Sequence, residues 1–133
     1  MELNPQKFNE AVKNLYAAAL SETIELLKNN KNGSFIALPD SDWVGAEIDD
    51  GDEYVGTAIW AVGVKDDGEL YVKARVDEGE YAPDLENEWI NAENIKEEAY
   101  PDIYRFVAQY LDEAVSEDEA DEVEPGDGYV LDL

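Results

Sequence analysis

Residues 54–77 read YVGTAIWAVGVKDDGELYVKARVD, in which two β-prone runs flank the tripeptide DDG at positions 66–68. Valine, isoleucine and aromatic residues favour strands, whereas Asp-Gly favours a tight turn. A three-residue loop with Gly68 in the left-handed conformation gives a hairpin that pairs apolar residues along one face. The predicted pairs are Val64 with Leu70, Val62 with Val72, Trp60 with Ala74, and Ala58 with Val76. A two-residue loop would oppose Val62 to Lys73 and mix the faces, so we predict the three-residue loop.

The other face of this hairpin combines short or apolar side chains on the first strand with long ones on the second. Its residues are Thr57, Ile59, Ala61, Gly63, Tyr71, Lys73 and Arg75. Because two of the long side chains are basic, we expect this face to be at least partly solvated.

Shorter β-prone segments precede the hairpin. Residues 34–38 form a short run that Pro39 closes, and residues 43–48 form a second run whose pattern Gly45 dilutes. Together with the hairpin, these segments predict a small antiparallel sheet of three to four strands.

Two amphipathic helices are predicted, one on each side of the strands in the sequence. The first begins at Asn4 and Pro5, which suit the N-cap and the first helical position, and ends in the segment NNKNG at 29–33. Apolar residues recur along it at steps of three and four: Phe8, Val12, Leu15, Tyr16, Ala19, Leu20, Ile24 and Leu27. The second helix begins near Pro101 and shows the same spacing up to Val115. The pattern indicates an α+β fold with both helices packed on the apolar face of the sheet.

The chain of 133 residues has the length of one domain. Residues 117–124, EDEADEVE, are too charged to be buried together. We therefore predict a single domain at 1–116 and an acidic, mobile C-terminal tail at 117–133.

The composition excludes several classes of enzyme. The chain has 34 acidic and 9 basic residues, a net charge of −25, and neither histidine nor cysteine. Ser-His-Asp catalysis, cysteine nucleophiles and zinc sites built from these ligands are therefore excluded. No glycine-rich phosphate loop occurs, and no pair of carboxylates stands out as catalytic. We expect a non-enzymatic protein without a cofactor.

The loop between the second and third predicted strands is the one candidate for metal binding. Asp49, Asp50, Asp52 and Glu53 surround Gly51, and Ca²⁺ prefers oxygen ligands of this kind. The spacing does not fit an EF-hand, because a match started at Asp40 puts Val44 at the fifth position and Gly51 at the twelfth. Weak Ca²⁺ binding is one alternative for this loop, and a plain Asp-Gly turn is the other.

The negative charge predicts the chemistry of a partner. It repels the phosphates of nucleic acids and attracts basic surfaces. We expect an acidic interaction domain that binds a basic protein surface and does not bind nucleic acid directly. One alternative is a DNA mimic that inhibits a nucleic-acid-binding protein, and another is that the charge serves solubility alone.

The charge is unevenly distributed, which indicates where a partner would bind. Residues 1–40 carry five acids and four bases, a balance of −1, whereas residues 41–133 carry 29 acids and five bases, a balance of −24. Tyrosines surrounded by charge are typical of interface anchors, or else they cap a small core with the hydroxyl in water. The candidate partner-binding residues are Tyr100, Tyr104, Asp112, Glu113, Glu117, Asp118 and Glu119.

The N-terminus lacks the basic and apolar regions of a secretory signal. No apolar run approaches the roughly 20 residues that span a bilayer. We therefore expect a cytoplasmic protein that does not enter membranes.

Overall fold

The computed structural model describes residues 5–49, 54–76 and 89–121 of the chain. Within these ranges an antiparallel sheet of five strands is combined with three α-helices, so the predicted α+β class is confirmed. The sheet has more strands than the three or four that the sequence predicted. The additional strand is β5 (Ile90–Asn91), which is too short to give a sequence pattern.

The sheet is organised around β3, its longest strand. The other strands are β1 (Phe35–Ala37), β2 (Val44–Asp49) and β4 (Leu70–Val76), and β3 itself is Tyr54–Val64. One edge of β3 pairs with β1 at residues 61–63 and with β2 at residues 54–59. The other edge pairs with β4, which in turn pairs with β5. The predicted strand at 43–48 therefore exists as β2.

The hairpin of β3 and β4 has the predicted three-residue loop. Gly68 has a φ of 81°, and its N–H donates to the carbonyl of Lys65 at 2.9 Å. Val64 pairs with Leu70 and Val62 with Val72, as predicted.

The predicted register is wrong beyond Ala61, because a β-bulge lies at Trp60. Ile59 pairs with Ala74 and Ala58 with Arg75, in place of the predicted pairs Trp60–Ala74 and Ala58–Val76. The extra residue in β3 turns both Ile59 and Val62 into the main core, where each is 0 % exposed. Ile59 therefore does not lie on the solvated face, where the sequence placed it.

Trp60 packs on the opposite face of the sheet, in a second cluster with Ala37 and Ala61. Lys73 is 8 % exposed there, with its Nζ atom 5.1 Å from the centre of the Trp89 ring and 6.0 Å from that of Trp60. Of the residues expected to be solvated on this face, Arg75 is exposed, whereas Ala61 and Lys73 are buried. The two tryptophan rings attract the Lys73 ammonium group, which explains how a lysine is accommodated at this depth.

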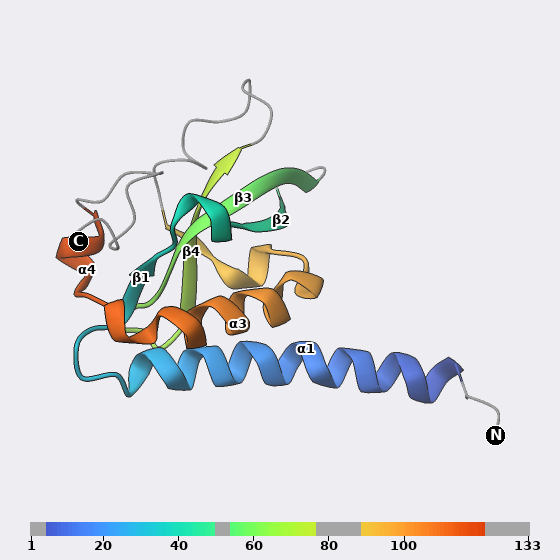
Figure 1. Ribbon diagram of the computed structural model, residues 1–133. Helices are drawn as coiled ribbons and strands as arrows, with labels where there is room; N and C mark the ends of the chain where they lie inside the picture. The colour runs from blue at the N-terminus through green and yellow to red at the C-terminus, as the bar shows by residue number, and fades with distance from the viewer. Residues whose placement is uncertain (1–4, 50–53, 77–88, 122–133) are drawn as a thin grey trace.

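The helices α1 (Pro5–Lys28) and α3 (Tyr100–Tyr110) lie side by side along the same side of the sheet (Figure 1). The main core contains residues from both helices and from the sheet, among them Leu27, Ile36, Leu38, Ile48, Ile59, Val62, Val72, Ile103 and Val107. The amide of Asn30 donates to the carbonyl of Leu111 at 2.9 Å and joins the C-terminal ends of the two helices.

The N-terminal half of α1 reaches beyond the end of α3 (Figure 1). Leu15 belongs to the predicted apolar stripe of this helix, yet its side chain is 57 % exposed. Helical spacing identifies which residues share a face, but it does not say how far the neighbouring elements extend. In the C-terminal half of α1 the stripe is buried, as the 0 % exposure of Leu27 shows.

Ordered structure continues past the predicted domain boundary at Ser116. After the 3₁₀ turn η4 (Leu111–Glu113), Val115 forms an isolated bridge with Phe35 through backbone hydrogen bonds of 2.7 and 3.0 Å. The helix α4 (Glu117–Asp121) follows, and its Ala120 is 2 % exposed. The segment that the sequence assigns to the tail thus begins with a short helix, and its residues 122–133 lie outside the described residues.

Candidate acidic binding surface

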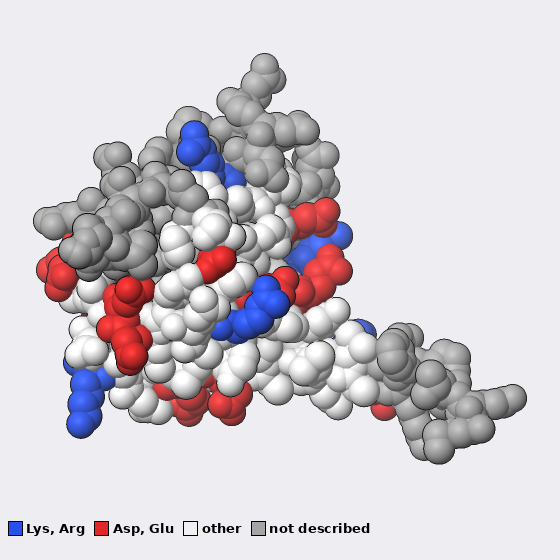
Figure 2. All heavy atoms as spheres, viewed as in Figure 1, with Lys and Arg blue, Asp and Glu red and all other residues white. Residues whose placement is uncertain are grey.

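Charge is distributed unevenly between the helix α1 and residues 89–121. The helix α1 carries three acids and three bases, a balance of 0, whereas residues 89–121 carry ten acids and two bases, a balance of −8. Figure 2 shows the acidic side chains in separate groups rather than in one continuous area. The sequence places the negative charge in the second half of the chain. On the described surface, this charge is concentrated in separate groups of acidic side chains.

Most of the acids in residues 89–121 have no basic partner. The ion pairs among the described residues are Lys65–Glu117 at 3.9 Å, Lys96–Glu47 at 2.8 Å and Arg105–Asp102 at 4.0 Å. Apart from Asp121, whose side chain is not described, the other carboxylates of this segment make no ion pair within the described ranges: Glu93, Glu97, Glu98, Asp112, Glu113, Asp118 and Glu119. Within the described part of the chain, no basic side chain is therefore close enough to pair with them.

One acidic group lies at the C-terminal end of α3. We call it the α4 surface, and it consists of Asp112, Glu113, Glu117, Asp118 and Glu119. The Val115 bridge fixes this segment to β1, and the hydroxyl of Ser116 accepts the N–H of Glu119 at 3.3 Å to cap α4. The acids in the first turn of α4 are also stabilised by the helix dipole. The structure thus brings five of the seven predicted partner-binding residues together.

The two predicted tyrosines have different environments. Tyr100 is 7 % exposed, and its hydroxyl donates to the carbonyl of Ala92 at 2.7 Å. Tyr104 is 36 % exposed on α3. Tyr104 is therefore the predicted aromatic residue that lies open on the surface, whereas Tyr100 is part of the core.

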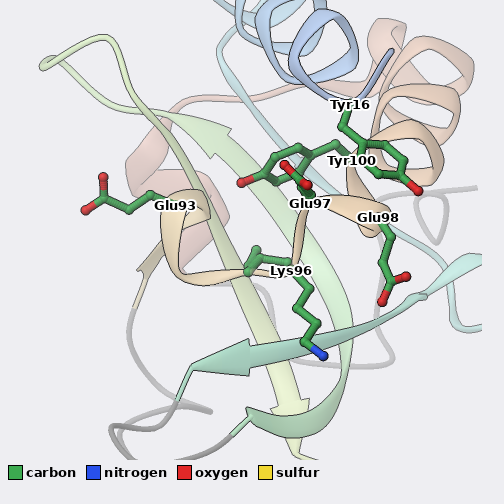
Figure 3. A pocket seen from close by; sticks show the side chains of 7 residues that line it. Tyr16, Glu93, Lys96, Glu97, Glu98 and Tyr100 are labelled. Carbon is green, nitrogen blue, oxygen red and sulfur yellow. The ribbon is translucent and has the colours of Figure 1, made fainter. Parts of the chain in front are cut away.

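A second acidic group surrounds a hollow at the N-terminal end of α3. The hollow has a volume of about 540 Å³ and is shown in Figure 3; its lining residues are Tyr16, Glu93, Ile95, Lys96, Glu97, Glu98 and Tyr100. We call it the Tyr16 hollow. Sequence reasoning did not place Tyr16 or Glu93 at a binding site, because Tyr16 belongs to α1 and meets the others only through the packing of α1 against α3.

Two short 3₁₀ turns position the glutamates of the Tyr16 hollow. Glu93 lies in η2 (Ala92–Asn94), where the side chain of Asn91 accepts its N–H at 2.9 Å. Glu97 and Glu98 begin η3 (Glu97–Ala99), directly before α3. The N–H of Lys96 donates to the carbonyl of Glu47 at 3.0 Å and fixes the intervening backbone to β2.

Lys96 is the one basic residue that lines the Tyr16 hollow, and its side chain extends toward β2 in Figure 3. Its Nζ atom lies 2.8 Å from a carboxylate oxygen of Glu47. In the same view, the carboxylate of Glu97 is seen against the ring of Tyr100. The lysine of the hollow therefore pairs with Glu47.

The pKa values of two tyrosines at the ends of α3 are raised. Burial raises the pKa of Tyr100, and the charges of Glu97 and Glu93 raise it further. The hydrogen bond that the Tyr110 hydroxyl donates to the Asp42 carboxylate raises the pKa of Tyr110 to about 12, with smaller contributions from burial and from the charges of Asp42 and Glu113. The nearby acids thus add to pKa shifts whose largest causes are burial at Tyr100 and the Asp42 hydrogen bond at Tyr110.

The raised pKa of Tyr110 predicts a loss of stability in alkaline solution. Its pKa in the folded protein is about 12, above the ordinary value of 10, so the unfolded chain releases this proton first. The free energy of unfolding should therefore be fully retained below about pH 10 and fall as the pH rises toward about 12. Tyr110→Phe removes the titrating group and should weaken this dependence, which urea denaturation at about pH 9 and about pH 11 measures. An identical alkaline loss in both proteins would contradict the assignment.

The helix α3 itself separates the two acidic groups. Its exposed side chains include Asp102, Tyr104 and Arg105, and Arg105 lies 4.0 Å from Asp102. A row of carboxylates along α3, as a DNA mimic would present, is therefore interrupted by a basic residue at this point.

Most of the candidate calcium loop lies outside the described residues. Asp49 is the last residue of β2 and is exposed, whereas Asp50, Asp52 and Glu53 lie outside the described residues. Across the described ranges, no three acidic side chains are grouped so that they could hold a metal ion.

No helix in the part of the chain that the structure covers has the length and apolar character to cross a bilayer.

Comparison with known proteins identifies no relative: no family model, curated protein or solved structure matches this chain. The function has to be argued from the surface itself.

Proposed function

We propose that this chain is a non-enzymatic interaction domain that binds a basic surface of another protein. The observation that carries the proposal is the set of seven carboxylates in residues 89–121 that have no basic partner among the described residues. A partner with lysine and arginine side chains would supply the missing positive charge.

The physical basis of this binding is electrostatic. Uncompensated carboxylates attract a positively charged partner over long range and accept charge-assisted hydrogen bonds from it on contact. The two acidic groups lie at opposite ends of α3, a helix of 11 residues that is about 16 Å long. A partner that contacts both groups must present basic residues over at least this distance.

A charge-matched pair of variants tests where the partner binds. The probe is a peptide of alternating lysine and arginine that is long enough to span α3, and an equally long glutamate peptide serves as the negative control. In the α4 surface, Asp118→Asn combined with Glu119→Gln removes two exposed, unpaired charges. We expect the affinity for the basic peptide, measured by calorimetry at low ionic strength, to fall about threefold, since each exposed charge pair contributes about 0.2–1 kcal/mol.

The matched control lies on the neutral helix. Glu10→Gln combined with Glu22→Gln removes two exposed charges from α1 and should change the affinity by less than about twofold, because α1 carries three acids and three bases and so no net charge. The proposal fails if the wild-type protein does not bind the basic peptide, or if the α1 variant weakens binding as much as the α4 variant does.

A further inference from the structure

The helix α1 carries exposed apolar side chains in addition to those that it contributes to the main core. It lies at the border of the fold, with α3 and the sheet on one side of it (Figure 1). We propose that the protein forms a dimer in which the α1 helices of two copies pack side by side, in antiparallel orientation, through these side chains. This surface differs from the acidic groups, so the proposal does not depend on the proposed function.

The residues that form the contact face are Ala11, Leu15 and Ala18, all of which are exposed. Their steps of four and three are the spacing of the a and d positions in a coiled coil. Leu15 is 57 % exposed, more than any other large apolar side chain of the described residues. At 3.6 residues per turn, Leu15 and the buried Leu27 point about 120° apart around the helix axis. The contact face is therefore separate from the face of α1 that packs in the core.

The contact face is self-complementary in an antiparallel pair. When Ala11 of one copy stands opposite Leu15 of the other, the two-fold axis also places Leu15 opposite Ala11. In the same register, Ala18 stands opposite Phe8, which precedes Leu15 by seven residues in the sequence. Each large residue thus meets a small one, and this alternation lets two helices approach closely and interdigitate.

Charge favours a second copy as the occupant of this face. The chain has a net charge of −25, but α1 carries three acids and three bases and so does not repel a copy of itself. Glu10 and Lys13 point about 140° and about 160° away from Leu15, so neither charge lies in the contact face. Beyond it, Glu22 of one copy comes within about one helical turn of Lys7 of the other, which brings opposite charges together.

The N-terminal half of α1, which includes Leu15, reaches beyond the end of α3 (Figure 1). A helical segment without tertiary packing is only marginally stable in water, and a second α1 supplies such packing. Two helices that overlap over about four turns bury less than the roughly 800 Å² per partner of a standard interface. We therefore expect a weak dimer with a Kd on the order of 0.1 mM.

Sedimentation equilibrium of the full chain at concentrations up to about 1 mM, about ten times the expected Kd, tests the dimer. Leu15→Glu places a charge in the contact face, and Ala17→Glu places the same charge at a position that points about 160° away from Leu15. Both residues are exposed, so both variants should fold, which urea denaturation verifies.

We expect the wild-type chain to dimerise across this concentration range. Leu15→Glu should raise the Kd at least about tenfold, because the contact would bury an unpaired charge, whereas Ala17→Glu should raise it less than about threefold. Raising the NaCl concentration from about 0.05 to about 0.3 M should tighten the dimer, because salt screens the repulsion between two acidic copies. The same change should weaken the binding of a basic peptide, so the two interactions are distinguishable.

A cross-linking experiment tests the orientation of the helices, since the chain has no cysteine of its own. In the antiparallel register, the Asn14 positions of the two copies are about 3 Å apart along the helix axis, and the Ala18 positions are about 15 Å apart. A short bismaleimide should therefore join two copies of Asn14→Cys at least about fivefold faster than two copies of Ala18→Cys. Parallel helices would bring the Ala18 positions together and reverse this order.

A wild-type chain that stays monomeric at about 1 mM would refute the dimer. Equal effects of Leu15→Glu and Ala17→Glu, or a dimer that weakens as salt is added, would overturn the contact face, and the reverse order of cross-linking would overturn the antiparallel pair. None of these results affects the proposed function, which the basic peptide tests.

Discussion

Gly33→Ala is expected to lower the free energy of unfolding by about 3 kcal/mol or more, because the position has neither space nor a suitable backbone conformation for a side chain. A Cβ atom at Gly33 would lie 2.2 Å from the carbonyl carbon and the carbonyl oxygen of Val115. Gly33 also has a φ of 150°, which residues with a side chain rarely adopt. Urea denaturation followed by tryptophan fluorescence measures the effect.

The clash at Gly33 cannot be relieved by a small movement, because the atoms that it involves belong to the backbone. Val115 is held by two hydrogen bonds to Phe35, which is the first residue of β1. Moving Val115 would break this bridge and displace the residues of the α4 surface on either side of it. We therefore expect Gly33→Ala to weaken binding of a basic peptide as well as stability.

The control for this prediction is Gly68→Ala in the hairpin loop. Gly68 also has a positive φ, of 81°, but a Cβ atom there would meet nothing within 4 Å. The substitution should therefore cost about 1 kcal/mol, which is the conformational penalty alone. If both variants lose the same stability, the close packing of Gly33 against Val115 is not real.

Leu27→Ala is expected to destabilise the protein by about 2–5 kcal/mol, because it leaves a cavity in the main core. The Leu27 side chain is 0 % exposed near the C-terminal end of α1, where the helix packs against the sheet and α3. The midpoint of urea denaturation should decrease accordingly.

Leu15→Ala provides the matched control on the same helix. The chemical change and the gain in helix propensity are the same, but Leu15 is 57 % exposed, so the effect should stay within about 0.5 kcal/mol. Similar shifts of the denaturation midpoint in the two variants would show that Leu15 is packed as closely as Leu27, in contradiction to the structure.

Features with local causes could be predicted from the sequence. The loop at 66–68 follows from Asp-Gly chemistry, and α1 begins at Pro5 because proline suits the first turn. The five acids of the α4 surface could be identified because they adjoin one another in the sequence. The helix α4 also has a local signal in the sequence, since Ser116 and Glu119 stand at the spacing of a capping box.

Features that depend on distant elements could not be predicted. Alternation of the side chains alone predicts a regular register for β3. The bulge at Trp60 breaks this register and lets both Ile59 and Val62 pack in the main core. The Tyr16 hollow combines residues of α1 with residues of η2, η3 and α3, and only their packing brings these together. The exposure of Leu15 likewise depends on where α3 begins.

The most direct test of the proposed function is the salt dependence of binding between the wild-type chain and the lysine-arginine peptide. If unpaired carboxylates attract the partner, raising the NaCl concentration from about 0.05 to about 0.3 M should increase the Kd at least about tenfold, because salt screens exposed charges. A Kd that is the same at both concentrations would contradict the account.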